Sequence, residues 1–97
     1  MMYFIGIEGG GTKSHGVLFD ENGKFIFQIS GPATNVWSVG LPLALDRLEK
    51  LIRYLYSKVN GGDQIVAGLA ISGASKTDVA LEIKSQLQVA LNHKLGL

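Results

Sequence analysis

The 97-residue chain has nine lysines and arginines against eight aspartates and glutamates, which gives a net charge of +1. This balance excludes the basic surface that binds nucleic acid or an anionic membrane. The chain has no cysteine, so disulfide frameworks, thiolate zinc sites and thiol nucleophiles are excluded, which is compatible with a cytoplasmic protein. We expect one small soluble domain, because no apolar run reaches the length of a transmembrane helix and the first residues do not resemble a signal peptide.

The first third of the chain predicts three antiparallel strands. Residues 3–7 form a continuously apolar run that is typical of a buried strand. Residues 8–14 are predicted to form a glycine-rich turn. Two more apolar runs, at 16–19 and 25–29, flank a segment that contains Asn-Gly. That pair is a strong hairpin signal because both residues tolerate a positive φ.

The rest of the chain predicts a helix, a strand and a second helix. Residues 30–40 contain Gly and Pro and are predicted as a loop, whereas residues 41–59 carry apolar residues at the steps of four and three that mark one helix face. A buried strand is expected at 65–71 and a helix at 77–92. The order β-β-β-α-β-α predicts an α/β fold with a mixed sheet. We expect residues 92–97 to add no strand, so that the sheet is incomplete at the C-terminus and leaves 65–71 at an open edge.

Residues 9–14, Gly-Gly-Gly-Thr-Lys-Ser, carry the most chemical information. Consecutive glycines let a ligand approach the backbone, and their N–H groups form a concavity that binds anions. The P-loop and the dinucleotide motif both fail here, because each needs a helix after the glycines and a strand is predicted instead. A simple hairpin needs only one or two glycines. The pattern therefore favours a phosphate-binding loop at a hairpin tip over a plain tight turn.

Residues 5–14 resemble the first phosphate motif of the superfamily that joins actin, hexokinase and the heat-shock chaperone ATPases. More narrowly, the chain resembles the BadF/BadG/BcrA/BcrD ATPase family, to which the N-acetylglucosamine kinases belong. Residues 34–37, TNVW, resemble the Thr-Asn-x-Trp stretch of these kinases, and residues 69–74, LAISGA, resemble the strand and Ser-Gly element that follows. The resemblance runs in order from residue 3 to residue 92. It implies an N-terminal lobe of ribonuclease H-like, or actin-like ATPase, fold.

The resemblance implies ATP and Mg²⁺ as cofactors. Gly10, Gly11 and Thr12 would lie against the β- and γ-phosphates, with the Thr12 hydroxyl donating a hydrogen bond. Glu8 would hold Mg²⁺ through water, since this ion takes few protein carboxylates. The alternative for Thr12 is a strand residue that satisfies its own turn, although the motif favours the phosphate role. Glu8 is equally an exposed acid at a strand end.

The resemblance also implies a sugar site. Asn35 would hydrogen-bond sugar hydroxyls, because an amide offers both donors and an acceptor. Trp37 would form an apolar wall near the sugar, although a single Trp in a small domain is more often in the core, where we expect it. Ser72 and Gly73 would line the sugar cleft; alternatively, Ser72 begins the turn to the next helix.

The function implied by the resemblance is ATP-dependent phosphorylation of the 6-hydroxyl of N-acetyl-D-glucosamine. The Asp base of this reaction is expected beyond Leu97, together with the second lobe, so we expect residues 1–97 alone to be inactive. N-acetylmannosamine, glucosamine or another hexose is an alternative substrate, and a homodimer is conceivable for the full-length protein. Two other functions stay open, a BadF-type ATPase activator and a non-catalytic truncated lobe that acts as an interaction module.

Overall fold

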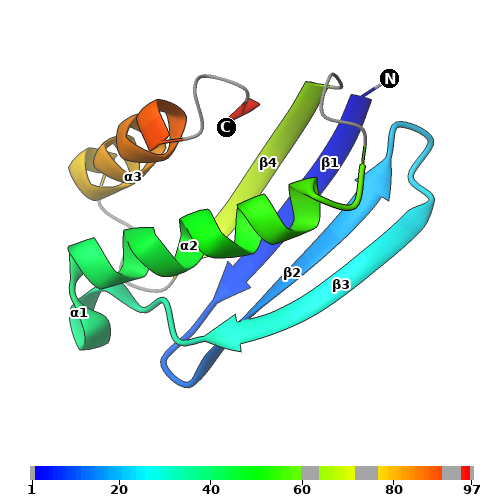
Figure 1. Cartoon of the computed structure of the whole chain (residues 1–97). Helices are drawn as coiled ribbons and strands as arrows, with labels where there is room; N and C mark the ends of the chain where they lie inside the picture. The colour runs from blue at the N-terminus through cyan, green and yellow to red at the C-terminus, as the bar shows by residue number, and fades with distance from the viewer. Residues whose placement is uncertain (1, 60–63, 72–76, 91–94, 97) are drawn as a thin grey trace.

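A computed structural model describes residues 2–59, 64–71, 77–90 and 95–96 of the chain. The elements follow in the order β1 (Met2–Gly9), β2 (Lys13–Asp20), β3 (Phe25–Pro32), α1 (Val36–Val39), α2 (Leu41–Tyr56), β4 (Gln64–Ile71), α3 (Thr77–Ala90) and β5 (Leu95–Gly96). Figure 1 shows a twisted sheet with the long helix α2 lying across one of its faces.

The strands form one mixed sheet in the order β3-β2-β1-β4-β5. Strand β2 lies antiparallel between β1 and β3, whereas β4 runs parallel to β1 and to β5. A parallel pair needs a long crossover connection, and α2 provides it between β3 and β4. The predicted α/β class, the antiparallel meander and the parallel fourth strand are confirmed.

One hydrophobic core lies between the sheet and the helices. Helix α2 has a proline in its first turn, where the missing N–H leaves no bond unmade. The predicted apolar stripe is confirmed at Leu48, Ile52 and Leu55, which are almost fully buried, while Leu41 and Leu45 are only partly buried. The core is completed by Leu51 of the same helix and by residues of four further elements: Ile5, Ile7, Leu18, Ile65, Ala67, Ile83 and Leu87.

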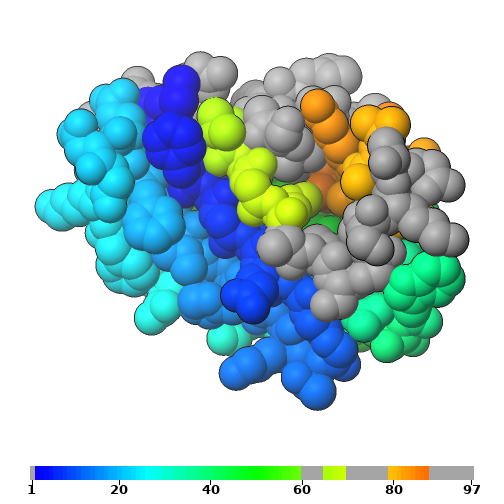
Figure 2. Space-filling model, turned by 180° about the vertical axis from the view of Figure 1, so that it is seen from behind, coloured from blue at the N-terminus to red at the C-terminus, as the bar shows by residue number. Residues whose placement is uncertain are grey.

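The other face of β1, β2 and β4 is not covered by a helix in the described part of the chain. In Figure 2, which views the molecule from behind, these three strands lie side by side at the surface. Side chains that alternate with the buried ones point to this face, among them Phe4 and Glu8 of β1. We call it the open face.

Two sequence boundaries are corrected at the hairpin ends. The predicted turn at 8–14 is too long, because the β1–β2 ladder continues through the pairs Glu8–His15 and Gly9–Ser14. The turn itself is residues 10–12, which we call the glycine loop. The predicted loop at 30–40 is also wrong at both ends, since its first residues extend β3 in register with β2 and residues 36–39 form α1.

The C-terminal half departs from the predictions in two places. Helix α2 ends at Tyr56 rather than at residue 59. The helix predicted at 77–92 is present as α3 over Thr77–Ala90, and its last two predicted residues lie outside the described part of the chain. The expectation that no strand follows α3 is wrong: β5 pairs in parallel with the first half of β4, through Ile65–Leu95 and Val66–Gly96. Two residues of extended backbone are enough for this pairing, although their sequence lacks the apolar run that usually signals a buried strand.

The hairpin between β2 and β3 has the geometry that its Asn-Gly pair predicts. Gly23 has a φ of 81°, and the Asp20 side chain accepts hydrogen bonds from the N–H groups of Asn22 and Lys24, each at 2.9 Å. Within the described residues, none of the helices combines the length and the apolar character needed to cross a membrane.

Candidate functional site

The glycine loop joins the carboxyl end of β1 to the start of β2. Its first residue closes the turn, because the Gly10 N–H donates to the Lys13 carbonyl at 3.0 Å. Gly11, Thr12 and Lys13 are exposed. The loop therefore presents backbone N–H groups and one hydroxyl to solvent, and Lys13, the first residue of β2, adds an ammonium group at the same end of the sheet.

The fold itself gives no reason for glycine at positions 10 and 11. Neither residue has a φ in the left-handed range, in contrast to Gly23. A Cβ atom at Gly10 would lie 3.6 Å from the Lys13 carbonyl oxygen, and one at Gly11 would lie 4.0 Å from the Asn35 amide nitrogen, which are ordinary contacts. The space above the loop is thus free for a group that approaches the backbone closely, as a phosphate does.

A second segment, 24 positions further along the chain from Gly10, lies against this loop. The Thr34 N–H donates to the Gly10 carbonyl at 3.3 Å, and the Asn35 side-chain amide lies beside Gly11, 4.0 Å from where a Cβ atom of that residue would be. The structure thereby brings together the phosphate motif and the Thr-Asn-x-Trp stretch, which sequence spacing alone could not place side by side. The Thr34 side chain is fully buried, and its hydroxyl has no hydrogen-bond partner among the described residues.

Asn35 is the N-cap of α1. Its Oδ1 atom accepts hydrogen bonds from the N–H groups of Trp37, at 2.9 Å, and Ser38, at 3.3 Å. These are the bonds that an N-cap side chain ordinarily makes. Contrary to the expectation, Asn35 therefore cannot offer both donors and an acceptor to a sugar, because its oxygen is engaged by the helix. Its Nδ2 group, which faces the glycine loop, is the part left to act as a donor.

Trp37 is 71% exposed, so the expectation that it belongs to the core is wrong. Its helix has only four residues and none of them is buried. The helix contacts the core through Val36, whereas Trp37 lies at the rim of the fold with most of its surface exposed. The indole is left at the surface, two residues after the Asn35 amide.

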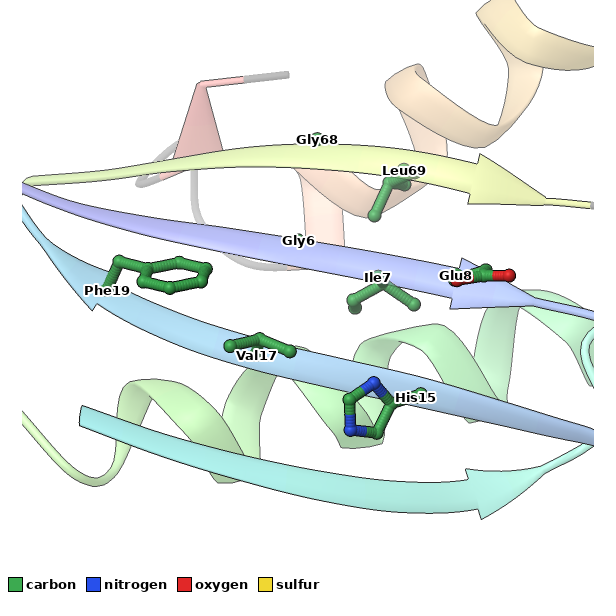
Figure 3. A pocket seen from close by; sticks show the side chains of 8 residues that line it. All are labelled: Gly6, Ile7, Glu8, His15, Val17, Phe19, Gly68 and Leu69. Carbon is green, nitrogen blue, oxygen red and sulfur yellow. The ribbon is translucent and has the colours of Figure 1, made fainter. Parts of the chain in front are cut away.

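Glu8 lies on the open face, at the end of β1 that leads into the glycine loop. It is exposed and pairs across the ladder with His15, whose Nε2 atom is 3.0 Å from Oε1 of Gln28. Both line a shallow hollow of about 500 Å³ whose other walls include Gly6 and Gly68. Figure 3 shows the two side chains at the same end of this hollow.

A magnesium ion fits this donor set in one way only. No group of three or more metal-ligating side chains exists in the described ranges. The exposed carboxylate of Glu8 could hold Mg²⁺ through water, because Mg²⁺ keeps several waters and is bound by one or two carboxylates together with substrate phosphates. The ion would then supply positive charge at the end of the sheet where the glycine loop leaves room for an anion.

The two remaining predicted site residues, Ser72 and Gly73, lie outside the described residues. What the structure describes is the strand before them: Gly9, at the end of β1, pairs with Ile71, at the end of β4. Both strands therefore end at the same edge of the sheet.

Two polar residues that sequence reasoning did not assign to the site hold the segment before Asn35. The Ser14 hydroxyl of β2 donates to the Pro32 carbonyl at 2.9 Å. The Arg47 guanidinium of α2 donates to the Ala33 carbonyl at 2.7 Å. In the sequence, Arg47 is an ordinary cation on the polar side of a helix, and its distant partner is a backbone carbonyl, which leaves no sequence signal.

The sequence was compared with protein families and with curated proteins. No protein-family profile matches the chain. The sequence is 32% identical to an N-acetyl-D-glucosamine kinase from Dictyostelium discoideum over 102 aligned positions, which cover 96% of this chain and 32% of that protein. The chain thus spans about a third of the length of this curated relative.

Solved structures agree with that similarity. A crystal structure from Chromobacterium violaceum, provisionally named an N-acetylglucosamine kinase, matches 87% of this chain and 30% of its own with a TM-score of 0.72 and 24% identity. A xylulose kinase from Lactobacillus acidophilus matches 71% of this chain and 15% of its own, with a TM-score of 0.57 and 29% identity. The fold is that of a lobe of sugar kinases, and the resemblance to N-acetylglucosamine kinases is confirmed. The ATPase-activator alternative is not favoured.

Proposed function

We propose that this chain forms the part of an ATP-dependent sugar kinase that holds the phosphates of ATP and one side of the sugar, and that the sugar is N-acetyl-D-glucosamine. The observation that carries the proposal is the contact between the glycine loop and Thr34–Asn35. A kinase must hold phosphoryl donor and acceptor side by side, because positioning and charge stabilisation supply nearly all of its catalysis. The similarity to the kinase from Dictyostelium discoideum supports this choice of substrate.

On the phosphate side, the residues of the glycine loop have distinct roles. Gly11 would donate its backbone N–H group to the β- and γ-phosphate oxygens, while Gly10, whose own N–H is engaged by the Lys13 carbonyl, would let the phosphates come close because it carries no side chain. The exposed Thr12 hydroxyl would add a second donor. Glu8 would orient the water shell of Mg²⁺ from the open face.

On the sugar side, the Asn35 Nδ2 group would donate to a hydroxyl oxygen, since its Oδ1 atom is already occupied by the cap of α1. The exposed indole of Trp37 would lie against the apolar C–H face of the sugar ring, as large aromatic surfaces with a polar tip commonly do at binding sites. Ser72 and Gly73, which follow β4, would line the same cleft.

The reaction forms a bond between O6 of the sugar and the γ-phosphorus, and breaks the bond from that phosphorus to the bridging oxygen of ADP. The proton of the 6-hydroxyl passes to a carboxylate base. We assign that base to no residue of this chain. The role of this chain is therefore to bind and orient the two substrates. We place this reaction in the cytoplasm, with which the absence of cysteine is compatible.

The single tryptophan of the chain makes the proposal directly testable. An exposed indole emits at long wavelength, and covering it with a sugar shifts its emission to shorter wavelength. We expect N-acetyl-D-glucosamine to produce this shift in the purified protein, and glucose, N-acetylmannosamine and xylulose to produce less of it. In a parallel titration of the isotope-labelled protein, MgATP should move the amide resonances of Gly10, Gly11 and Thr12.

Matched variants complete the test. Thr12→Ala should weaken MgATP binding without affecting the sugar-induced shift, and Trp37→Phe should remove the optical signal while MgATP still binds. ADP release that depends on the sugar, from any longer product that contains this sequence, would support the kinase. ATP hydrolysis that no sugar stimulates would instead identify an ATPase, and a chain that binds neither ligand would refute the proposal.

A further inference from the structure

Residues 32–35, which we call the connector, link β3 to α1 and touch the glycine loop. Their bond to the loop, from the Thr34 N–H to the Gly10 carbonyl, measures 3.3 Å. This is slightly beyond the usual range for an N–H···O hydrogen bond, and such bonds are weak. The position of the connector relative to the loop therefore depends on its other contacts.

The shortest of these contacts comes from Arg47. Its Nη1 atom donates to the Ala33 carbonyl at 2.7 Å, in partly buried surroundings. A hydrogen bond from a charged donor is shorter and about twice as strong as a neutral one. A second hydrogen bond to the body of the fold, between Ser14 and Pro32, joins two neutral groups at 2.9 Å, and the Thr34 side chain is buried.

Arg47 also differs from its neighbours on α2. Lys50 and Arg53 each pair with a carboxylate one turn back, at 2.9 and 3.4 Å. The residue four positions before Arg47 is Leu43, so the same kind of pair cannot form there. Its guanidinium reaches instead to a carbonyl 14 positions earlier in the chain, and its rigid planar fork suits the fixing of one acceptor in one place.

We propose that Arg47 is a positioning residue of the kinase site. By holding the Ala33 carbonyl, it keeps Thr34 and Asn35 against the glycine loop, so that the phosphate and sugar sites move as one unit. The effect of Arg47 on substrate binding rests on the proposed function, whereas its effect on the position of the connector does not. Arg47 acts through the connector, and we assign it no contact with either substrate.

Hydrogen exchange on the intact chain tests the geometric part. Arg47→Met keeps the aliphatic stem and removes the donor, Arg47→Lys keeps a charged donor without the fork, and Lys50→Met removes a neighbouring charge on the same helix. We expect Arg47→Met to speed exchange at the Thr34 and Trp37 amides by about tenfold, which corresponds to ~1.4 kcal/mol of local stability. Arg47→Lys should be intermediate, and Lys50→Met should leave these amides unchanged.

Ligand binding tests the functional part. The affinity for N-acetyl-D-glucosamine is measured with and without a non-hydrolysable MgATP analogue, so that the coupling between the sites is obtained. We expect Arg47→Met to lower this coupling and Arg47→Lys to restore part of it, with the core amides of α2 as protected as in the wild type.

The outcomes are distinct. Unchanged exchange at Thr34 in Arg47→Met, or faster exchange spread over the whole chain, would overturn the positioning role. Local loosening with unaltered coupling would also overturn it, because the connector would then be held without consequence for the site. Binding of neither ligand by the wild type would refute the proposed function, while the exchange rates would still decide whether Arg47 holds the connector.

Discussion

Replacing single glycines by alanine should separate the residues that build the fold from those that leave room for a ligand. Gly16 lies in β2 beneath helix α2, where a new Cβ atom would be 2.9 Å from Leu55 Cδ1. Leu55 has no exposed surface, so its side chain has little room to move away. Overpacking of this kind costs about 1–3 kcal/mol. In a domain of this size, each kcal/mol lowers the melting temperature by roughly 4–8 °C.

Gly11 should behave in the opposite way. Its new Cβ atom would be 4.0 Å from the Asn35 amide nitrogen and its φ lies outside the left-handed range, so alanine is accepted without strain. Restricting the unfolded chain can even add about 0.4–1 kcal/mol of stability. The same methyl group would occupy the space into which a phosphate oxygen must come, and MgATP affinity should fall steeply.

Thermal unfolding followed by circular dichroism, together with calorimetric titration of MgATP, measures both effects. Gly68→Ala is the matched control, since nothing lies within 4 Å of its new Cβ atom and it is remote from the loop; it should change neither quantity much. If Gly11→Ala melted as early as Gly16→Ala, glycine would be needed there by the fold and not by a ligand. If Gly11→Ala bound MgATP as the wild type does, the loop would not face the phosphates.

Substitutions at three further positions probe the connector and helix α1, which follows it. Asn35→Ala should destabilise α1 by about 0.5–2 kcal/mol through loss of its cap, which faster hydrogen exchange of the Trp37 amide would show. Asn35→Asp should keep the cap but bind the sugar more weakly. If Asn35→Asp bound the sugar as the wild type does, donation by Nδ2 would be excluded. Trp37→Phe should alter the free energy of unfolding by less than about 0.5 kcal/mol, because the side chain is 71% exposed, while calorimetry records weaker sugar binding. Thr34→Val should leave the unfolding free energy in urea unchanged or raise it by about 1 kcal/mol, since the buried hydroxyl has no partner among the described residues; a clear loss would indicate a partner elsewhere.

Much of the fold followed from local patterns. The Asn-Gly turn, the apolar stripe around Leu48 and Leu55 and the strand before residue 72 are each encoded by neighbouring residues, and all were predicted correctly. The errors arose where tertiary contacts decide the outcome. Glycine and polar residues at 8–9 and 13–14 join strands because a partner strand continues beside them, and β5 exists because β4 offers it a free edge.

Only part of the candidate site could be predicted from the sequence. The glycine loop could be recognised from its motif, since its chemistry resides in consecutive residues. The engagement of Asn35 as a helix cap was hidden, because the sequence predicted no helix at 36–39. The exposure of Trp37 could not be predicted either. A single Trp outside any predicted helix or strand belongs to no periodic pattern that would indicate whether it is buried.

The hydrogen bonds of the connector suggest why stability and substrate binding can vary independently in this lobe. The core under α2 consists of buried apolar side chains, whose loss is felt by the whole domain. The connector, in contrast, is held by the buried Thr34 side chain and by a few polar bonds, among which the one from Arg47 carries a charge. Segments with few buried apolar contacts can open locally while the rest stays folded. A sugar bound to Asn35 and a phosphate bound to the glycine loop would each oppose that opening. Each ligand should therefore strengthen the binding of the other, with no larger rearrangement of the sheet.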